Sequence, residues 1–166
     1  MPARHNNLIW PHINAWYLEA AAKLRMVDLL DDELKNITGL FKGTDYVFYE
    51  VYNPYNGKAD GGWQYGHHWE SCINQTWCAT GYIGAMLYGV MGMKITENSI
   101  SFSPCVPYSL YNISVEGLTV GGSKVDILIT GSGSEIEKVV LNGRETELAV
   151  IERNTECCRI EIFLKG

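Results

Sequence analysis

The sequence predicts an α+β protein in which the helices come first and the strands follow. Hydrophobic residues recur at helical spacing in the first half of the chain and alternate with polar residues in short runs in the second half. The change of period lies near Lys94 to Asn98. We therefore expect a helical region at 1–94 and an antiparallel, β-sandwich-like domain at 95–166.

The first helix is predicted at 12–25. It follows Trp10-Pro11, and proline suits a first helical turn because its missing N–H would have no helical partner there. One apolar stripe at helical spacing contains Ile13, Tyr17, Ala20, Ala21 and Leu24, widened by Trp16 and Ala22.

A second helix is predicted at 27–41, antiparallel to the first and joined to it by a tight turn. Its apolar stripe is Leu30, Leu34, Ile37 and Phe41. Its acidic residues Asp28, Asp31, Asp32 and Glu33 lie early, where they complement the helix dipole.

A long segment without hydrophobic period, 42–71, follows the second helix. Loops of this length inside a compact domain are usually functional or disordered. The segment is rich in aromatic residues, which argues against disorder: Tyr46, Phe48, Tyr49, Tyr52, Tyr55, Trp63, Tyr65 and Trp69. We expect an ordered binding loop.

The segment 72–93 contains no charged residue, so its length alone would satisfy a membrane span. Polar residues at its start and four glycines in its body make it less apolar than such a span, and no basic flank anchors it. We expect a helix enclosed by protein, with glycines that let neighbouring helices approach, and no membrane partner.

The β domain is predicted from short alternating runs such as 125–129 and 159–164. Turn signals separate the runs: Gly121-Gly122, Gly131 to Gly133 and Asn142-Gly143, the last a strong hairpin signature. Together they predict an antiparallel sheet or sandwich.

Composition excludes several classes of function. Nineteen acidic residues against 13 Lys and Arg give a net charge of −6, without the basic clusters that nucleic acid requires. Residues 1–7 are polar and no signal-peptide pattern follows, so we expect a cytoplasmic protein. The five cysteines are odd in number and include an adjacent pair, which favours reduced, buried thiols.

Two glutamates in aromatic surroundings are the candidates for catalysis, because sugar sites combine aromatic rings with carboxylates. Glu50 and Glu70 both satisfy this description, although a loop carboxylate bonded to backbone or solvent is the commoner case. His67-His68 and the nearby cysteines lack the spacing of a zinc site, and the paired glycines lack a phosphate-loop pattern. We expect neither a metal nor a cofactor.

Three motifs follow one another along the chain: Leu8-Ile9-Trp10-Pro11-His12-Ile13-Asn14, then Phe48-Tyr49-Glu50-Val51-Tyr52-Asn53-Pro54-Tyr55-Asn56-Gly57, then Gln75-Thr76-Trp77-Cys78-Ala79-Thr80-Gly81-Tyr82. In this order they resemble the C-terminal part of six-hairpin glycosidases, the group of trehalases, processing glucosidases and rhamnosidase-like enzymes. The resemblance covers nearly the whole chain. It implies that the helices belong to an incomplete (α/α)6 toroid and that a small β-sandwich tail follows them.

The resemblance also implies roles for residues. Glu50 would be the general base of an inverting hydrolase, and the candidate substrate-binding residues are Trp10, His12, Asn14, Tyr52, Trp69 and Trp77. An inverting enzyme needs a second carboxyl group roughly 6.5–9.5 Å from the base. In this superfamily that general acid lies upstream of anything present here, and nothing in the motifs supports Glu70 in the role.

The leading hypothesis is therefore the C-terminal part of a glycoside hydrolase, inactive by itself, whose partner is a carbohydrate. The alternatives are a noncatalytic carbohydrate-binding module and a structural remnant that associates with itself. Because an inner helix of a toroid is normally covered on all sides, we also expect a homo-oligomer or association with a missing N-terminal region of the same enzyme.

Overall fold

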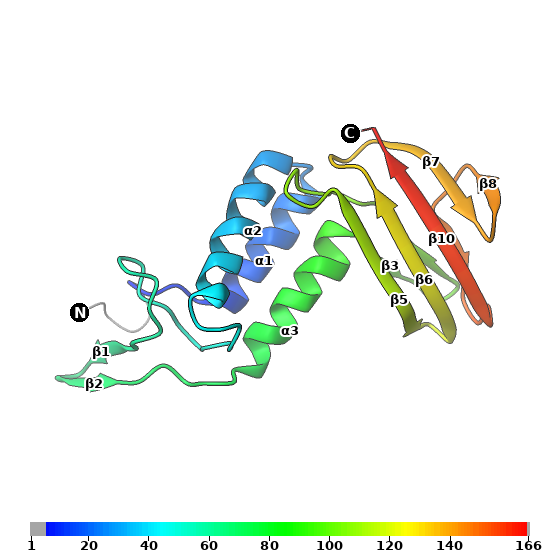
Figure 1. The fold of residues 1–166 in the computed structure, drawn as a ribbon. Helices are drawn as coiled ribbons and strands as arrows, with labels where there is room; N and C mark the ends of the chain where they lie inside the picture. The colour runs from blue at the N-terminus through cyan, green and yellow to red at the C-terminus, as the bar shows by residue number, and fades with distance from the viewer. Residues whose placement is uncertain (1–5, 166) are drawn as a thin grey trace. The chain divides into compact units, whose positions relative to one another are not determined.

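The computed structural model describes residues 6–165 and has the predicted α+β organisation. Figure 1 shows that the three helices precede all but one short pair of strands along the chain. The described residues form two compact units. Unit 1 contains 6–18 and 32–85, and unit 2 contains 19–31 and 86–165.

The helix α2, Val27–Lys42, has the predicted buried face. Leu30, Leu34, Ile37 and Phe41 are each at most 4% exposed. Local period and acidic residues at the start were sufficient to predict this helix, because its opposite face is polar.

The helix α1, Pro11–Lys23, buries only Ala21 and Ala22 of the predicted stripe. Its buried residues are Ala15, Leu18, Ala21 and Ala22, whereas Ile13, Tyr17, Ala20 and Leu24 are exposed. Small side chains explain the choice in unit 1, because a Cβ on Gly81 would lie only 3.1 Å from that of Ala15. The bulky side chains of the predicted stripe would not fit so close to the backbone of Gly81.

The end of α1 carries an arginine in a position that usually holds glycine. The Met26 and Arg25 amides donate to Ala21 O and Ala22 O, both at 3.0 Å, in a Schellman arrangement. The backbone of Arg25 has a left-handed conformation, with a φ of 60°, which is strained for a residue with a side chain. Its guanidinium donates to the carbonyls of Ser103 and Pro104 at 3.0 and 2.6 Å, and to the Ser103 hydroxyl.

The aromatic segment after α2 contains two short strands that were not predicted. β1, Gly62–Gln64, pairs antiparallel with β2, His67–Trp69. The turn residues Tyr65 and Gly66 both have positive φ, 48° and 81°. Tyrosine is an unusual residue for this geometry, which is why the turn carried no sequence signal.

The uncharged segment forms the helix α3, Thr76–Gly84, and a π-helical turn, Ala85–Val90. Two of its glycines pack closely on α1 backbone or side chains, Gly81 within unit 1 and Gly89 within unit 2. Trp77 and Ile83 remain exposed, so α3 is only partly enclosed. None of the helices in 6–165 combines the length and the apolar character needed to cross a bilayer.

The larger sheet of unit 2 has the strand order β5-β6-β10-β7-β8. These strands are Asn112–Val120, Ser123–Thr130, Cys157–Leu164, Ile136–Leu141 and Arg144–Thr146, in that order across the sheet. A smaller sheet contains β3, Lys94–Ile95, β4, Ser99–Ser101, and β9, Val150–Glu152. Side chains that alternate along β6 and β10 supply much of the core of this unit.

One strand pair departs from the antiparallel prediction. β10 runs parallel to β6 and antiparallel to β7, and it lies between them. The glycines at 131–133 therefore do not close a hairpin. An alternating pattern gives the faces of a strand but not the direction of its neighbour, so the sequence could not reveal this pairing.

Two predicted turns are confirmed, and both close hairpins. Asn142 and Gly143, with φ of 49° and 78°, connect β7 to β8. Gly121 and Gly122, with φ of 57° and 78°, connect β5 to β6. Both turns have positive φ at their two central residues, which the twist of an antiparallel pair favours.

Candidate functional site

The backbone around Glu50 is fastened to the segment that leads into α3. The Glu50 amide donates to Cys72 O at 2.9 Å, and the Gln75 amide donates to Phe48 O at 2.9 Å. Tyr49 and Ile73 form an isolated antiparallel bridge between these bonds. The loop that carries the predicted base is thus held as a short two-stranded ribbon.

A single side chain closes this ribbon at its next position. The Ser71 hydroxyl accepts from the Val51 amide at 3.0 Å and donates to Val51 O at 2.9 Å. Ser71 is 8% exposed and Val51 is completely buried. Water therefore cannot substitute for this hydroxyl, which makes it a positioning group for the residue that precedes Val51, Glu50.

Glu50 is 9% exposed, so its carboxyl group does not project into bulk solvent. Its charge acts on the His12 imidazole and on the Cys78 thiol. Burial lowers the pKa of His12 and outweighs the opposite effect of Glu50. Burial raises the pKa of Cys78 to about 11, and the charge of Glu50 adds to that rise.

At neutral pH the His12 imidazole and the Cys78 thiol are consequently uncharged. The Cys78 thiol lies 3.8 Å from Glu50 O, to which it donates, and it is not a nucleophile in this state. An imidazole with a lowered pKa cannot form an ion pair with Glu50 near pH 7.

Three tryptophans surround the His12 ring. Trp10 and Trp16 contact it edge-to-face at centroid distances of 5.8 Å, and Trp77 packs on it at 5.3 Å with an interplanar angle of 32°. We call these four residues the tryptophan–histidine cluster. Trp16 and Trp77 are 63% and 49% exposed, so the cluster presents aromatic surface to solvent.

Trp16 was absent from the predicted site. The available signal was its position four residues after His12 in the same helix, where side chains share a face. The helical spacing of the apolar residues predicts Trp16 as part of the apolar stripe instead. The structure brings together Trp10, His12, Glu50 and Trp77 from the predicted set.

The other predicted binding residues have different surroundings. Asn14 donates from its side chain to Glu33 of α2. Tyr52 is fully buried, and its hydroxyl hydrogen-bonds to the Thr44 hydroxyl at 3.2 Å within the loop. Trp69 is half-buried on β2, and Glu70 is exposed. These positions tie Asn14 and Tyr52 to neighbouring protein groups.

The described residues contain no cluster of three or more His, Cys, Asp or Glu side chains that could hold a metal ion. His68 bonds through Nε2 to Asp60 O at 2.8 Å. The thiols of Cys78, Cys105 and Cys158 are buried and free, whereas Cys72 and Cys157 are exposed, which corrects the expectation that all five are buried.

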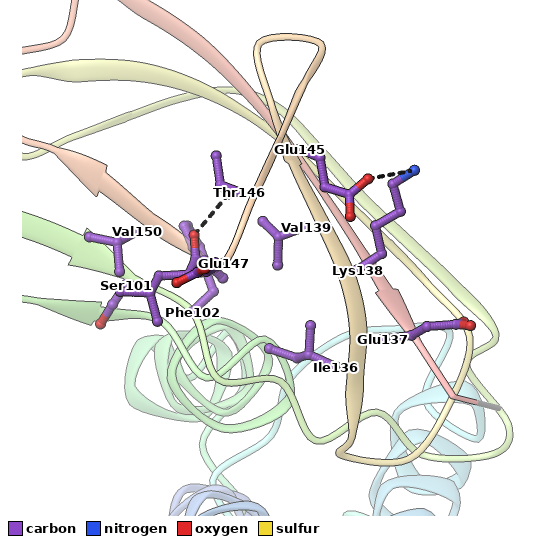
Figure 2. A pocket seen from close by; sticks show the side chains of 12 residues that line it. Ser101, Phe102, Ile136, Glu137, Lys138, Val139, Glu145, Thr146, Glu147 and Val150 are labelled. Carbon is purple, nitrogen blue, oxygen red and sulfur yellow. Dashed lines mark hydrogen bonds and ion pairs between the residues drawn. The ribbon is translucent and has the colours of Figure 1, made fainter.

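Cavities occur in both units. A cavity of about 510 Å³ in unit 1 is lined by residues of the aromatic loop, including Thr44, Tyr49 and Lys58. A cavity of about 480 Å³ in unit 2 lies along β7 and the β8–β9 connection. Figure 2 shows the ion pair between Lys138 and Glu145 at its wall, with a nitrogen–oxygen distance of 3.3 Å. Glu137 and Glu147 also line this cavity, so its wall carries three carboxylates against one lysine.

Comparison with known proteins finds a distant relation over part of the chain. No family model matches the sequence. The protein-glucosylgalactosylhydroxylysine glucosidase of Danio rerio is 28% identical over 75 residues, which are 45% of this chain and 12% of that protein. The chain is thus similar in part to a glycoside hydrolase, and the match spans about one eighth of the relative.

Proposed function

We propose that this chain carries the general-base side of an inverting glycoside-hydrolase site, with Glu50 as the base. The observation that carries the proposal is the position of Glu50, buried and in electrostatic contact with His12 of the tryptophan–histidine cluster. The motif around Glu50 and the partial similarity to a glucosidase support the same assignment.

In this proposal Glu50 takes a proton from a water molecule that attacks the anomeric carbon from the face opposite the leaving group. A general base must be close to its proton donor and held in position. The Cys72 carbonyl and the Ser71 hydroxyl fix the backbone on either side of Glu50, which supports this requirement.

The sugar would bind against Trp77 and Trp16. The carbon face of a pyranose is apolar and flat, and exposed indole rings offer a matching surface with small conformational cost. The contacts of both rings with His12 restrict their orientation. Trp10 would then support the cluster from the start of α1.

The general acid of this proposal comes from protein outside the present sequence. Without an acid to protonate the leaving group, a factor of roughly 10²–10⁴ in rate is lost. The isolated chain is therefore expected to bind a glycan and not to hydrolyse it.

Binding to glucosylgalactosylhydroxylysine, followed by calorimetry, tests the sugar site, because the partial relative is named for that glycan. Trp77→Ala should weaken the affinity by at least about fivefold. Trp63→Ala is the matched control, since Trp63 is 45% exposed and lies on β1. Equal losses in the two variants, or no binding by the natural chain, would contradict the proposed site.

A hydrolysis assay tests whether the general base lies in this chain and the general acid outside it. Incubation of the natural chain with the same glycan should release no glucose above the buffer rate. Glucose release that Glu50→Gln abolishes would place the acid within this sequence and reject the shared-site proposal.

A noncatalytic carbohydrate-binding module is the second candidate function. The exposure of Trp16 and Trp77 favours it, because such modules need aromatic surface and no carboxylate. Glu50→Gln separates the candidates: binding should change severalfold if the carboxylate contacts the sugar, and should remain unchanged in a module that uses only the rings.

A further inference from the structure

The largest of the three cavities described for the two units is in unit 2 and has no role in the proposed hydrolase site. Its volume is about 770 Å³, within the range of roughly 300–1,000 Å³ that is typical of small-molecule sites. Segments far apart in the sequence line it: the end of α1, the π-helical turn, and the strands β3 and β4.

Three cations line this cavity against one carboxylate. They are Lys23, Arg25 and Lys94, and the carboxylate is Glu19. Lys23 Nζ lies 3.8 Å from Glu19 Oε2, so this pair largely compensates itself. Arg25 and Lys94 leave the cavity positive in a chain whose net charge is −6.

Arg25 is the cation whose position is fixed. Its side chain donates to the Ser103 and Pro104 carbonyls and to the Ser103 hydroxyl, which are in the same unit. These three bonds leave part of the donor set of the guanidinium uncommitted. The strained, left-handed backbone of Arg25 keeps this cation where glycine would be easier to accommodate.

The wall of the cavity also offers carbon surface. Tyr88 and Ile95 line it and are 44% and 41% exposed. Gly92 brings the backbone so close that an added Cβ would lie 2.0 Å from Ser103 O. Tyr88 belongs to the π-helical turn, a feature that is frequent at functional sites.

We propose that this cavity binds a small organic anion whose carboxylate or phosphate group contacts Arg25 and Lys94. The flat or apolar part of the ligand would lie against Tyr88 and Ile95. The guanidinium suits both kinds of anion, because its planar donors match two oxygens at once. The proposal does not depend on Glu50 or on hydrolysis.

Calorimetric titration of the full chain distinguishes the ligand classes. The probes are glucuronate, glucose 6-phosphate, inorganic phosphate and glucose. One of the two charged sugars should bind saturably, more tightly than inorganic phosphate and glucose, and more weakly as salt increases. The tighter of the charged sugars identifies the preferred anion. Binding of glucose with equal affinity, or the absence of saturable binding by both charged sugars, would overturn the proposal.

Two charge variants locate the binding. Lys94→Gln should weaken the affinity roughly fivefold by removing one charge-assisted contact. Lys138→Gln is the matched control, because Lys138 is also exposed and lines the other cavity of unit 2. Amide shifts in the NMR spectrum should concentrate at 88–95 and 101–103. Equal losses in the two variants, or shifts centred elsewhere, would refute this site.

Discussion

The hydroxyl of Ser71 should be worth several times more than an ordinary surface hydrogen bond. It satisfies both the amide and the carbonyl of Val51, which are 3.0 and 2.9 Å away. Ser71→Ala removes one small polar atom and leaves two backbone groups without that partner. Because Val51 is completely buried, solvent cannot take the place of the hydroxyl.

The magnitude follows from the desolvation of those two groups. An unsatisfied buried donor or acceptor costs about 1–3 kcal/mol, and relaxation makes two adjacent losses less than additive. We expect Ser71→Ala to lower the free energy of unfolding by about 2–4 kcal/mol. For a chain of this size the midpoint temperature should fall by roughly 5–15 °C.

Urea denaturation followed by tryptophan fluorescence measures this change where it occurs. All five tryptophans, at positions 10, 16, 63, 69 and 77, belong to unit 1, which also contains Ser71. Ser71→Thr retains the hydroxyl and is the matched control. A Ser71→Ala protein within about 0.5 kcal/mol of the natural chain would refute the bridging role, because that is the scatter of neutral surface substitutions.

Three further predictions concern other parts of the chain. Gly61→Ala should destabilise the β1–β2 hairpin by more than about 2 kcal/mol, because the φ of Gly61 is 73° and a Cβ would lie 2.0 Å from Trp69 O; loss of the hairpin cross-peaks in the NMR spectrum would report it. In the native protein near pH 7, a thiol reagent should modify exposed Cys72 and spare Cys78, whose pKa is about 11; equal labelling rates would contradict the buried, protonated state of Cys78. Trp16→Ser should weaken self-association measured by sedimentation velocity, because Trp16 is 63% exposed; a natural chain that is already monomeric at micromolar concentration would contradict the predicted oligomer.

Elements whose signals are local could be predicted from sequence. The α2 stripe from Leu30 to Phe41 is buried as its period indicates, because the opposite face is polar. The Asn142-Gly143 turn has the positive φ values that its residues favour. In both cases the deciding interactions lie within a few residues of one another.

Elements that pack against segments distant in the sequence could not be predicted in this way. The buried face of α1 depends on the close approach of Gly81 to Ala15, and the bulky residues Ile13, Tyr17 and Leu24 of the predicted stripe are exposed instead. The parallel neighbour of β6 comes from the end of the chain and enters between β6 and β7. The period of the hydrophobic residues indicates which side chains share a face, but not which other segment covers that face.

The candidate site combines both kinds of information. The sequence by itself determined that Glu50 lies in an aromatic loop with a glycosidase-like motif. Only the tertiary structure decided that Glu50 is buried beside His12 and Cys78, and that Trp16 joins the cluster. Desolvation and Coulomb interactions depend on distances in space, so groups far apart in the chain together set the charge state of the site.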